Sequence, residues 1–226
     1  MFTRRSVHDA RADTVAVIGL GRFGASVALE LMSIDADVFG IDVDEELVQR
    51  YDGQLTRVVR ADTTDEKALQ ELSLEEFDRV VVAIGSNLEA SILTCSLLLE
   101  LGVESVWAKA TSHAHGRILS QLGVHHVVYP ETEMGRRVAH RVRGALLDYI
   151  EIGTGLALVR TEVPQDMAGG PIDEDALWRH HRVKAVAVRS PSLGWMPIVR
   201  GTIVNAGDLI QVTGTTKDVE AFAQVR

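Results

Sequence analysis

The residues best suited to chemistry in this 226-residue sequence form the string GLGRFG at positions 19–24. Its spacing is G-x-G-x-x-G, and it lies directly between an apolar run and a helical pattern. Gly19 would permit a tight turn, Gly21 would let a phosphate approach the backbone, and Gly24 would let helix and strand pack closely. Free N–H groups and the helix dipole favour a phosphate there. The string predicts a nucleotide-binding corner; the alternative is an α/β turn without a ligand.

Two acidic positions follow later strands. Asp42 lies 18 residues beyond Gly24, at the end of the second expected strand. A carboxylate there accepts hydrogen bonds from both ribose hydroxyls and repels a 2′-phosphate, which disfavours NADP. The alternative for Asp42 is a cap of the next helix. Asp62 and Thr63 follow the third strand, where an adenine edge could be read; the alternative for Asp62 is a turn or cap residue.

Further residues are expected around the same crevice. Ile84 and Gly85 follow the fourth strand, and ligands gather at the carboxyl ends of parallel strands. Arg22 would add charge-assisted contacts to phosphate, which suits a triphosphate or a phosphate presented by a neighbouring subunit. Lys109, at the end of the fifth strand, would add a second cation. The alternative for both is exposure to solvent or pairing with acids. Phe23, within the glycine string, is the last residue expected to line the nucleotide-binding crevice.

No catalytic arrangement accompanies this motif. Cys95 lies in an apolar helical stretch and is expected to be a buried small hydrophobe rather than a nucleophile. Several histidines could act as bases or metal ligands, but none offers a full ligand set. We expect surface or partly buried positions for them: His113, His115, His125, His126, His180 and His181. Since hydride transfer needs a substrate pocket and an acid–base group, we expect a binding protein and not an enzyme.

Strand and helix patterns alternate through residue 147. The expected strands are 14–18, 37–41, 55–60, 79–84, 105–109 and 124–128. The expected helices are 22–34, 44–51, 65–72 with Thr64 as its cap, 87–101, 112–122 and 131–147. This order predicts an α/β fold with a Rossmann-like, doubly wound parallel sheet.

Strands dominate after residue 148. They are expected at 149–152, 156–162, 183–189, 196–199 and 209–213, with helices near 173–180 and 216–222. The sequence thus predicts an N-terminal tail over 1–13, a nucleotide-binding domain over 14–147 and a small α+β C-terminal lobe over 148–226.

Composition narrows the class of protein. With 46% apolar and 24% charged residues, the chain is neither fibrous nor disordered. No apolar run reaches the roughly 20 residues that a membrane-spanning helix needs, and residues 1–13 lack the apolar stretch of a signal peptide. A single cysteine fits a reducing cytoplasm. The net charge of −9 argues against non-specific binding to nucleic acid.

Several strings together resemble one family. They are VIGLGRFG at 17–24, GID at 40–42, VAIG at 82–85, WAKA at 107–110 and YPETEMG at 129–135. The chain resembles the cytosolic regulatory subunits of Trk/Ktr potassium uptake systems, the RCK (regulator of potassium conductance) proteins. This resemblance implies binding of ATP, ADP or NAD(H), homodimers assembled into an octameric ring, and a potassium-translocating membrane subunit as partner. It also implies a cytoplasmic location at the inner face of the cell membrane, with membrane contact only through that partner.

The resemblance also suggests roles for single residues. Gly19, Gly21 and Gly24 match the residues that hold the phosphates, and Asp42 matches the ribose ligand. Arg22 matches an arginine that reaches a terminal phosphate across the subunit pair. Lys109 matches a lysine of the fifth-strand motif. Glu131 matches a glutamate that can share a divalent cation, Mg²⁺ or Ca²⁺, with phosphates. Without the resemblance, Glu131 is an acid favoured by the dipole at a helix start.

The C-terminal lobe resembles a lobe that binds cyclic di-AMP in related Ktr regulators, over residues 171–209. The sequence departs from that pattern near residues 176–182, where the expected arginine has no clear place. Two alternatives remain from the residues themselves. One is a small NAD-dependent oxidoreductase, for which no base can be placed. The other is a redox-sensing transcriptional regulator, for which residues 1–13 are too few to form a DNA-binding module.

Overall fold

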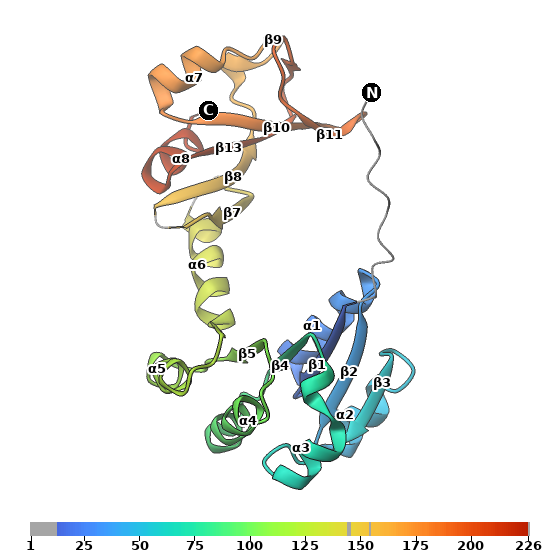
Figure 1. Ribbon diagram of the computed structural model, residues 1–226. Coiled ribbons are helices and arrows are strands. Elements are labelled where there is room, and N and C mark those ends of the chain that lie inside the picture. The colour runs from blue at the N-terminus through green and yellow to red at the C-terminus, as the bar shows by residue number, and fades with distance from the viewer. Residues whose placement is uncertain (1–12, 144–145, 154, 226) are drawn as a thin grey trace, which may run out of the picture. The chain divides into compact units, whose positions relative to one another are not determined.

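The computed structural model describes residues 13–143, 146–153 and 155–225 (Figure 1). Its contacts form two compact units, Met1–Glu131 and Thr132–Arg226, and each is treated by itself. The sequence places the domain boundary after residue 147, whereas the contacts group most of helix α6 (Pro130–Arg143) with the second unit. The predicted tail lies outside the described residues, apart from Asp13.

The first unit is built on six parallel strands in the order β3-β2-β1-β4-β5-β6. Their bounds are β1 Thr14–Ile18, β2 Asp37–Asp42, β3 Arg57–Arg60, β4 Arg79–Val82, β5 Val106–Lys109 and β6 His126–Val128. The helices between them are α1 Arg22–Ser33, α2 Glu45–Tyr51, α3 Glu66–Leu72, α4 Leu88–Glu100 and α5 His113–Leu122. The strand order reverses between β1 and β4, which confirms the predicted doubly wound sheet.

Each face of this sheet carries its own core, as a doubly wound fold requires. On one face, Ile18 and its neighbours pack against apolar side chains of α3, α4 and α5, including Leu98 and Leu119. On the other face, Val17 and its neighbours pack against α1 and α2, including Ala28. Because successive strand residues point to opposite faces, β1 contributes to both cores and is buried between them.

Short polar side chains fix where the helices of this unit begin. Asp44, Asn87 and Ser112 accept hydrogen bonds from backbone N–H groups in the first turns of α2, α4 and α5. The predicted cap of α3 was wrong: Asp65, and not Thr64, accepts from the N–H of Lys67. The hydroxyl of Thr64 instead donates to Asp62 in the preceding turn.

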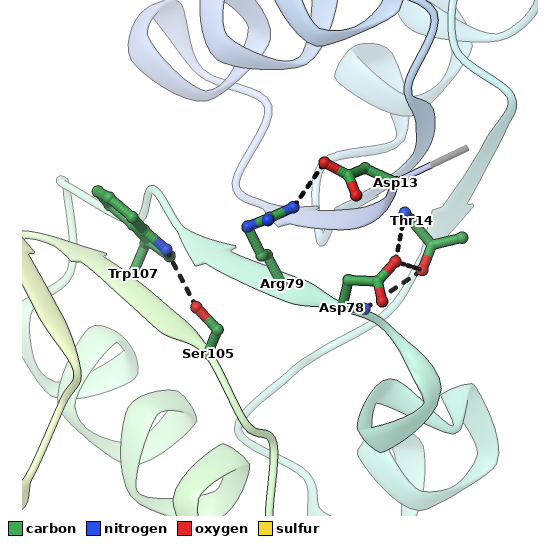
Figure 2. A network of polar contacts seen from close by, with 6 residues as sticks. All are labelled: Asp13, Thr14, Asp78, Arg79, Ser105 and Trp107. Atoms are coloured by element: carbon green, nitrogen blue, oxygen red, sulfur yellow. Dashed lines mark hydrogen bonds and ion pairs between the residues drawn. The ribbon is translucent and has the colours of Figure 1, made fainter. Parts of the chain in front are cut away.

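A polar network aligns the amino ends of the central strands (Figure 2). The N–H and hydroxyl of Thr14 each donate to the Asp78 carboxylate at 2.8 Å, and Arg79 pairs with Asp13 at 2.9 Å. These contacts join the start of β1 to the start of β4. The glycine motif lies at the other end of β1, where its carboxyl end leads into α1.

The second unit holds an antiparallel sheet in the order β11-β10-β13-β8-β7. Its strands are β7 Asp148–Glu151, β8 Leu156–Glu162, β10 Lys184–Ser190, β11 Gly194–Pro197 and β13 Leu209–Thr215. Helices α7 (Glu174–His181) and α8 (Thr216–Phe222) pack on it, which confirms the small α+β lobe. A short pair, β9 (Gly170–Pro171) with β12 (Ile203–Val204), was not predicted because two-residue strands carry no periodicity.

An ion pair joins α6 to β7 within the second unit. Arg137 binds both carboxylate oxygens of Asp148, with contacts of 2.7 to 2.9 Å. Burial is the largest single influence and would raise the pKa of Asp148, but the Arg137 hydrogen bonds, the Tyr149 N–H and the charges of Arg137 and Arg160 together leave it lowered. A lowered pKa means that this pair stabilises the fold above the ordinary aspartate range and ceases to do so as the pH falls through the folded value.

Arg137→Met should therefore lower the stability of this unit by about 1 kcal/mol at neutral pH, since the guanidinium is partly exposed and screened by solvent. The difference from the unmodified protein should shrink below about pH 4, where the Asp148 carboxyl of the unfolded chain is protonated. Urea unfolding at a series of pH values measures this. Arg136→Met is the control, because its contact with Glu151 is longer, at 3.9 Å, and more exposed. If the free energy of unfolding of Arg137→Met stayed at a constant difference from that of the unmodified protein at every pH, the stabilising role of the Arg137–Asp148 pair would be contradicted.

Among the described residues, no helix combines the length and the apolar character needed to cross a membrane.

Candidate nucleotide-binding site

The glycine corner between β1 and α1 is closely packed at two of its three glycines. Gly19 adopts a φ of 94°, which favours glycine, and its N–H donates to the carbonyl of Ile41 at 2.8 Å. A Cβ at Gly19 would lie 3.2 Å from the backbone of Ala83 and Ile84. A Cβ at Gly24 would collide with the carbonyl oxygen of Gly19. The corner therefore requires both glycines for its own packing.

Gly21 has a different role. A Cβ built there meets no atom of the described residues within 4 Å, so the packing of residues 13–131 does not require a glycine at this position. Gly21 is the N-cap of α1, and its helix start receives no side-chain hydrogen bond, whereas side chains cap α2 to α5. The backbone N–H groups of the first α1 turn are thus available to an anion.

Asp42 binds the glycine corner directly. The N–H of Leu20 donates to its Oδ2 at 2.6 Å, and the N–H of Asp44 donates to its Oδ1 at 2.9 Å. The cap of α2 is Asp44, whose carboxylate accepts from Glu46, so the alternative of Asp42 as helix cap was wrong. The structure brings the carboxylate predicted to bind ribose and the loop predicted to bind phosphate within one hydrogen bond of each other.

The side chains of Asp62 and Thr63, after β3, already have hydrogen-bond partners within the protein. The Asp62 Oδ1 accepts from the N–H and the hydroxyl of Thr64 at 2.9 and 2.7 Å, and these two bonds lower the pKa of Asp62. Asp62 therefore makes the turn that was its alternative interpretation. The hydroxyl of Thr63 is buried and bonds to Thr94 at 2.9 Å, so only the Thr63 backbone could contact a nucleotide.

The predicted cation and acid of the site form a pair. Lys109 Nζ lies 2.6 Å from Glu131 Oε1 and 5.5 Å from the centre of the Phe23 ring. It also lies 3.3 Å from where a Cβ of Gly85 would be. The Lys109 side chain is only 12% exposed, while that of Glu131 is 68% exposed. Pairing with an acid was the alternative interpretation for Lys109, and the structure shows it, with another predicted site residue as the partner.

Neighbouring cations keep the Glu131 carboxylate ionised. The hydrogen bond from Lys109 is the main reason why its pKa is lowered, and the charges of Lys109 and of Arg22 act in the same direction. Arg22 itself is exposed at the first position of α1. Two cations and one ionised carboxylate thus lie near an uncapped helix start. The cations suit a phosphate, and the carboxylate oxygen beside them suits a metal cation shared with that phosphate.

The remaining candidates for chemistry are structural. Cys95 is buried, as predicted, and burial raises the pKa of its thiol to about 12, so it is not a nucleophile at neutral pH. Within the described parts of the chain, no three His, Cys, Asp or Glu side chains group as metal ligands. His125 accepts the N–H of Val106 at 3.0 Å, and the exposed His126 stacks on Trp107.

The prediction for His115 was wrong. Its side chain is 1% exposed, and its Nδ1 lies 3.3 Å from both the backbone nitrogen and the hydroxyl of Thr111. Its burial could not be predicted, because a histidine in the first turn of a predicted helix has no distinguishing pattern. Its place beneath the loop that follows Lys109 is visible only in three dimensions.

Comparison with known proteins was consistent over nearly the whole chain. Residues 15–130 match the family model of the TrkA-N domain. The chain is 35% identical over 208 residues to the Ktr system potassium uptake protein C of Bacillus subtilis (strain 168), covering 92% of this chain and 94% of that protein. A relative with such a name supports the expectation that the chain is not an enzyme.

Solved structures agree on the fold. The GsuK RCK domain has a TM-score of 0.65 at 18% identity, covering 97% of this chain and 48% of that one. The GsuK channel bound to NAD has a TM-score of 0.62 at 18% identity, covering 94% and 39%. This chain thus spans less than half of those chains, and the likeness concerns the fold alone. Together with the matched domain and the 35% identity, it completes the assignment: the chain belongs to the TrkA-N-domain family of Trk/Ktr potassium uptake proteins.

Proposed function

We propose that this chain is the nucleotide-sensing regulatory subunit of a potassium uptake system and that it binds ATP or ADP at the glycine corner. The observation that carries the proposal is that a candidate ribose ligand and a candidate phosphate site lie together at the carboxyl ends of the parallel strands. Asp42 is bonded to the phosphate-binding loop, and Lys109 and Arg22 lie beside the uncapped start of α1. The family of the chain supplies the potassium uptake context.

NAD(H) is the second candidate ligand, and a specific observation favours it. Asp42 suits any adenosine ribose with a free 2′-hydroxyl, and the GsuK channel of similar fold was solved with NAD. Arg22 argues for ATP or ADP, because an exposed guanidinium at the phosphate site adds most to a ligand with a charged terminal phosphate. The oxidoreductase alternative gains no support, since no base has been placed beside the crevice.

The proposed nucleotide acts as a signal. A ligand shifts a conformational equilibrium only by the difference between its affinities for the two states. ATP and ADP differ by one phosphate, which Arg22 and a bridging cation would sense. Coupling of roughly 1–3 kcal/mol per site is typical, and several sites in a ring add such increments into a decisive shift.

Assembly follows from the same proposal. We place the chain in homodimers and in an octameric ring, on the cytoplasmic side of the cell membrane and in contact with a potassium-translocating subunit. Helix α6 supports subunit pairing, because Met134, Val138 and Val142 repeat every four residues along it and are 45 to 81% exposed. Apolar side chains that share a helix face in this way suit contact with a second protein surface.

Glu131 fits as one ligand of a divalent cation shared with phosphate oxygens. Its carboxylate is exposed and ionised at neutral pH, and Lys109 uses only Oε1. Carboxylate and phosphate oxygens are the ligands that Mg²⁺ and Ca²⁺ prefer. A single carboxylate cannot hold the ion alone, so the phosphates, water or a second subunit would complete the set. When bound, the ion would neutralise phosphate charge.

Glu131→Gln should reduce the gain in ATP affinity that Mg²⁺ produces, by about threefold or more, because a neutral amide is a poorer Mg²⁺ ligand. Affinity without Mg²⁺ should stay the same or rise, since a negative charge beside the phosphates is lost. Calorimetric titration of ATP and ADP, with and without Mg²⁺, measures both effects. Glu133→Gln is the control, as an exposed acid two residues further along α6 and on another face of the helix. An unchanged Mg²⁺ effect in Glu131→Gln would contradict the cation assignment.

The C-terminal lobe remains a proposed site for cyclic di-AMP. The missing arginine has a candidate, because Arg182 ends α7 and its guanidinium lies 5.5 Å from the Trp178 ring. Fluorescence titration of the full chain with cyclic di-AMP, compared with Arg182→Met, tests this. The regulatory role itself is tested by potassium uptake in cells that lack their own regulator. Uptake that does not respond to this chain, expressed with a Ktr-type membrane subunit, would count against the role.

A further inference from the structure

The loop after β5 connects Lys109 to helix α5 and lies beside Gly85. The Cγ2 atom of Thr111 lies 3.8 Å from where a Cβ of Gly85 would be, next to Lys109 Nζ. One end of the loop is anchored, because the N–H of Ala110 donates to the carbonyl of Val128 at 2.8 Å. The other end depends on a buried imidazole.

That imidazole is His115, and its protonation state can be read from its partner. The backbone N–H of Thr111 can only donate, so Nδ1 of His115 must accept it. The ring proton of neutral His115 is therefore on Nε2, which has no hydrogen-bond partner among the described residues. A second proton would have to occupy Nδ1 and turn it into a donor, so the Thr111 N–H would lose its acceptor and only the Thr111 hydroxyl, also 3.3 Å away, could still bind the ring.

The surroundings also favour neutral His115. Burial is the cause of its lowered pKa, with no contribution from a charged neighbour. The elements packed against α5 are α4 and β6. Their titratable groups are Glu89, Cys95 and Glu100 on α4 and His126 on β6, with Tyr129 following β6 and His113 and Arg117 on α5 itself.

Resting on the proposed function, we infer that His115 is a positioning residue of the nucleotide site: its neutral Nε2–H form holds the Lys109–Thr111 loop against Gly85. Protonation of His115 removes the hydrogen bond from the Thr111 N–H and thereby loosens the loop that carries Lys109. Nucleotide affinity then decreases as the pH decreases, and the group responsible does not touch the nucleotide. Regulation of this kind would link the nucleotide signal to the acidity of the cytoplasm.

Two substitutions of similar size separate positioning from simple packing. Asparagine places an acceptor near the position of Nδ1 and does not titrate, whereas glutamine places its polar group near Nε2. His115→Asn should keep the affinity for ATP, and His115→Gln should weaken it about two- to tenfold, the effect of one hydrogen bond. Ser112→Ala is the control for the helix start, because it removes the hydroxyl that accepts the His115 backbone N–H but leaves the His115 ring and Thr111 unchanged.

The pH dependence gives the decisive readout. The ratio of the ATP dissociation constants of the unmodified protein and His115→Asn cancels the titration of the nucleotide itself. Because burial lowers the pKa of His115, this ratio should stay constant at about pH 8 and rise only as the pH falls below the ordinary imidazole value of about 6.5. Ser112→Ala should behave as the unmodified protein does. A constant ratio, or equal affinities of His115→Asn and His115→Gln, would overturn the inference.

A measurement without nucleotide keeps the two proposals apart. In NMR spectra of the free protein, the Thr111 amide should be protected from solvent exchange at neutral pH and lose protection as His115 titrates. In His115→Asn it should stay protected. An amide that exchanges freely at neutral pH overturns the inference about His115, whatever binds in the crevice. Failure of the unmodified protein to bind ATP would instead refute the proposed function.

Discussion

Gly24→Ala should abolish measurable nucleotide binding and destabilise the first unit by about 2–3 kcal/mol, the upper part of the range for overpacked sites. The new Cβ would collide with the Gly19 carbonyl and lie 2.9 Å from the Ala83 Cβ, so α1 must move away from the end of β1. That movement displaces the N–H groups that would face the phosphate. Thermal unfolding and ATP titration measure the two losses.

Gly21→Ala is the matched control for this experiment. Its Cβ meets no atom within 4 Å in the part of the chain that the structure describes, and its φ of −64° is open to any residue, so stability should change by less than about 0.5 kcal/mol. Affinity for nucleotides should nevertheless fall, because the methyl group stands where a phosphate approaches the backbone. If Gly24→Ala were as stable as the unmodified protein, the packing account of the corner would be wrong. If Gly21→Ala bound ATP normally, the phosphate would not lie there.

Asp42→Ala should weaken ATP and ADP binding at least several-fold, and about tenfold if both ribose hydroxyls bind the carboxylate. It removes the ribose acceptor and releases the Leu20 N–H that Asp42 holds in the glycine corner. Selectivity should change as well, since loss of the carboxylate removes the repulsion of a 2′-phosphate and raises the affinity for NADP relative to NAD. Calorimetric titration with the four nucleotides measures these changes.

Asp44→Ala provides the comparison for Asp42→Ala. It removes the cap of α2, which costs about 1 kcal/mol of stability, but takes no acceptor from the ribose. Its nucleotide affinity should therefore stay near that of the unmodified protein. Unchanged ATP affinity in Asp42→Ala would refute the ribose assignment, and equal losses in both variants would reduce it to an indirect effect on the loop.

Local patterns were sufficient to predict most of the fold. The strand at residues 14–18 and the helix at 216–222 were predicted with their observed bounds, because apolar periodicity and capping residues define both ends. The predicted helix over 131–147 was too long, since Leu146 and Leu147 are not helical and Asp148 begins β7. Where two oxygen-bearing residues adjoin, as at Thr64 and Asp65, the sequence cannot tell which one caps the helix.

The positions of the proposed site residues at strand ends and at a helix start could be predicted, but their contacts could not. Asp42, Lys109 and Glu131 were all proposed from strand ends and from the family resemblance. That Asp42 holds Leu20 and that Lys109 holds Glu131 depends on side-chain directions at different strands, which spacing along the chain does not fix. His115 illustrates the same limit, since its importance lies in a hydrogen bond made after a turn.

The central claim is that the crevice binds an adenine nucleotide as a signal and releases it chemically unchanged. Equilibrium dialysis of the purified protein against ATP, ADP and NADH, followed by chromatography of the nucleotides on both sides, tests it most directly. We expect saturable binding below millimolar concentration, with every nucleotide recovered intact. No binding of any of the three at millimolar concentration, or steady consumption of NADH, would contradict the account.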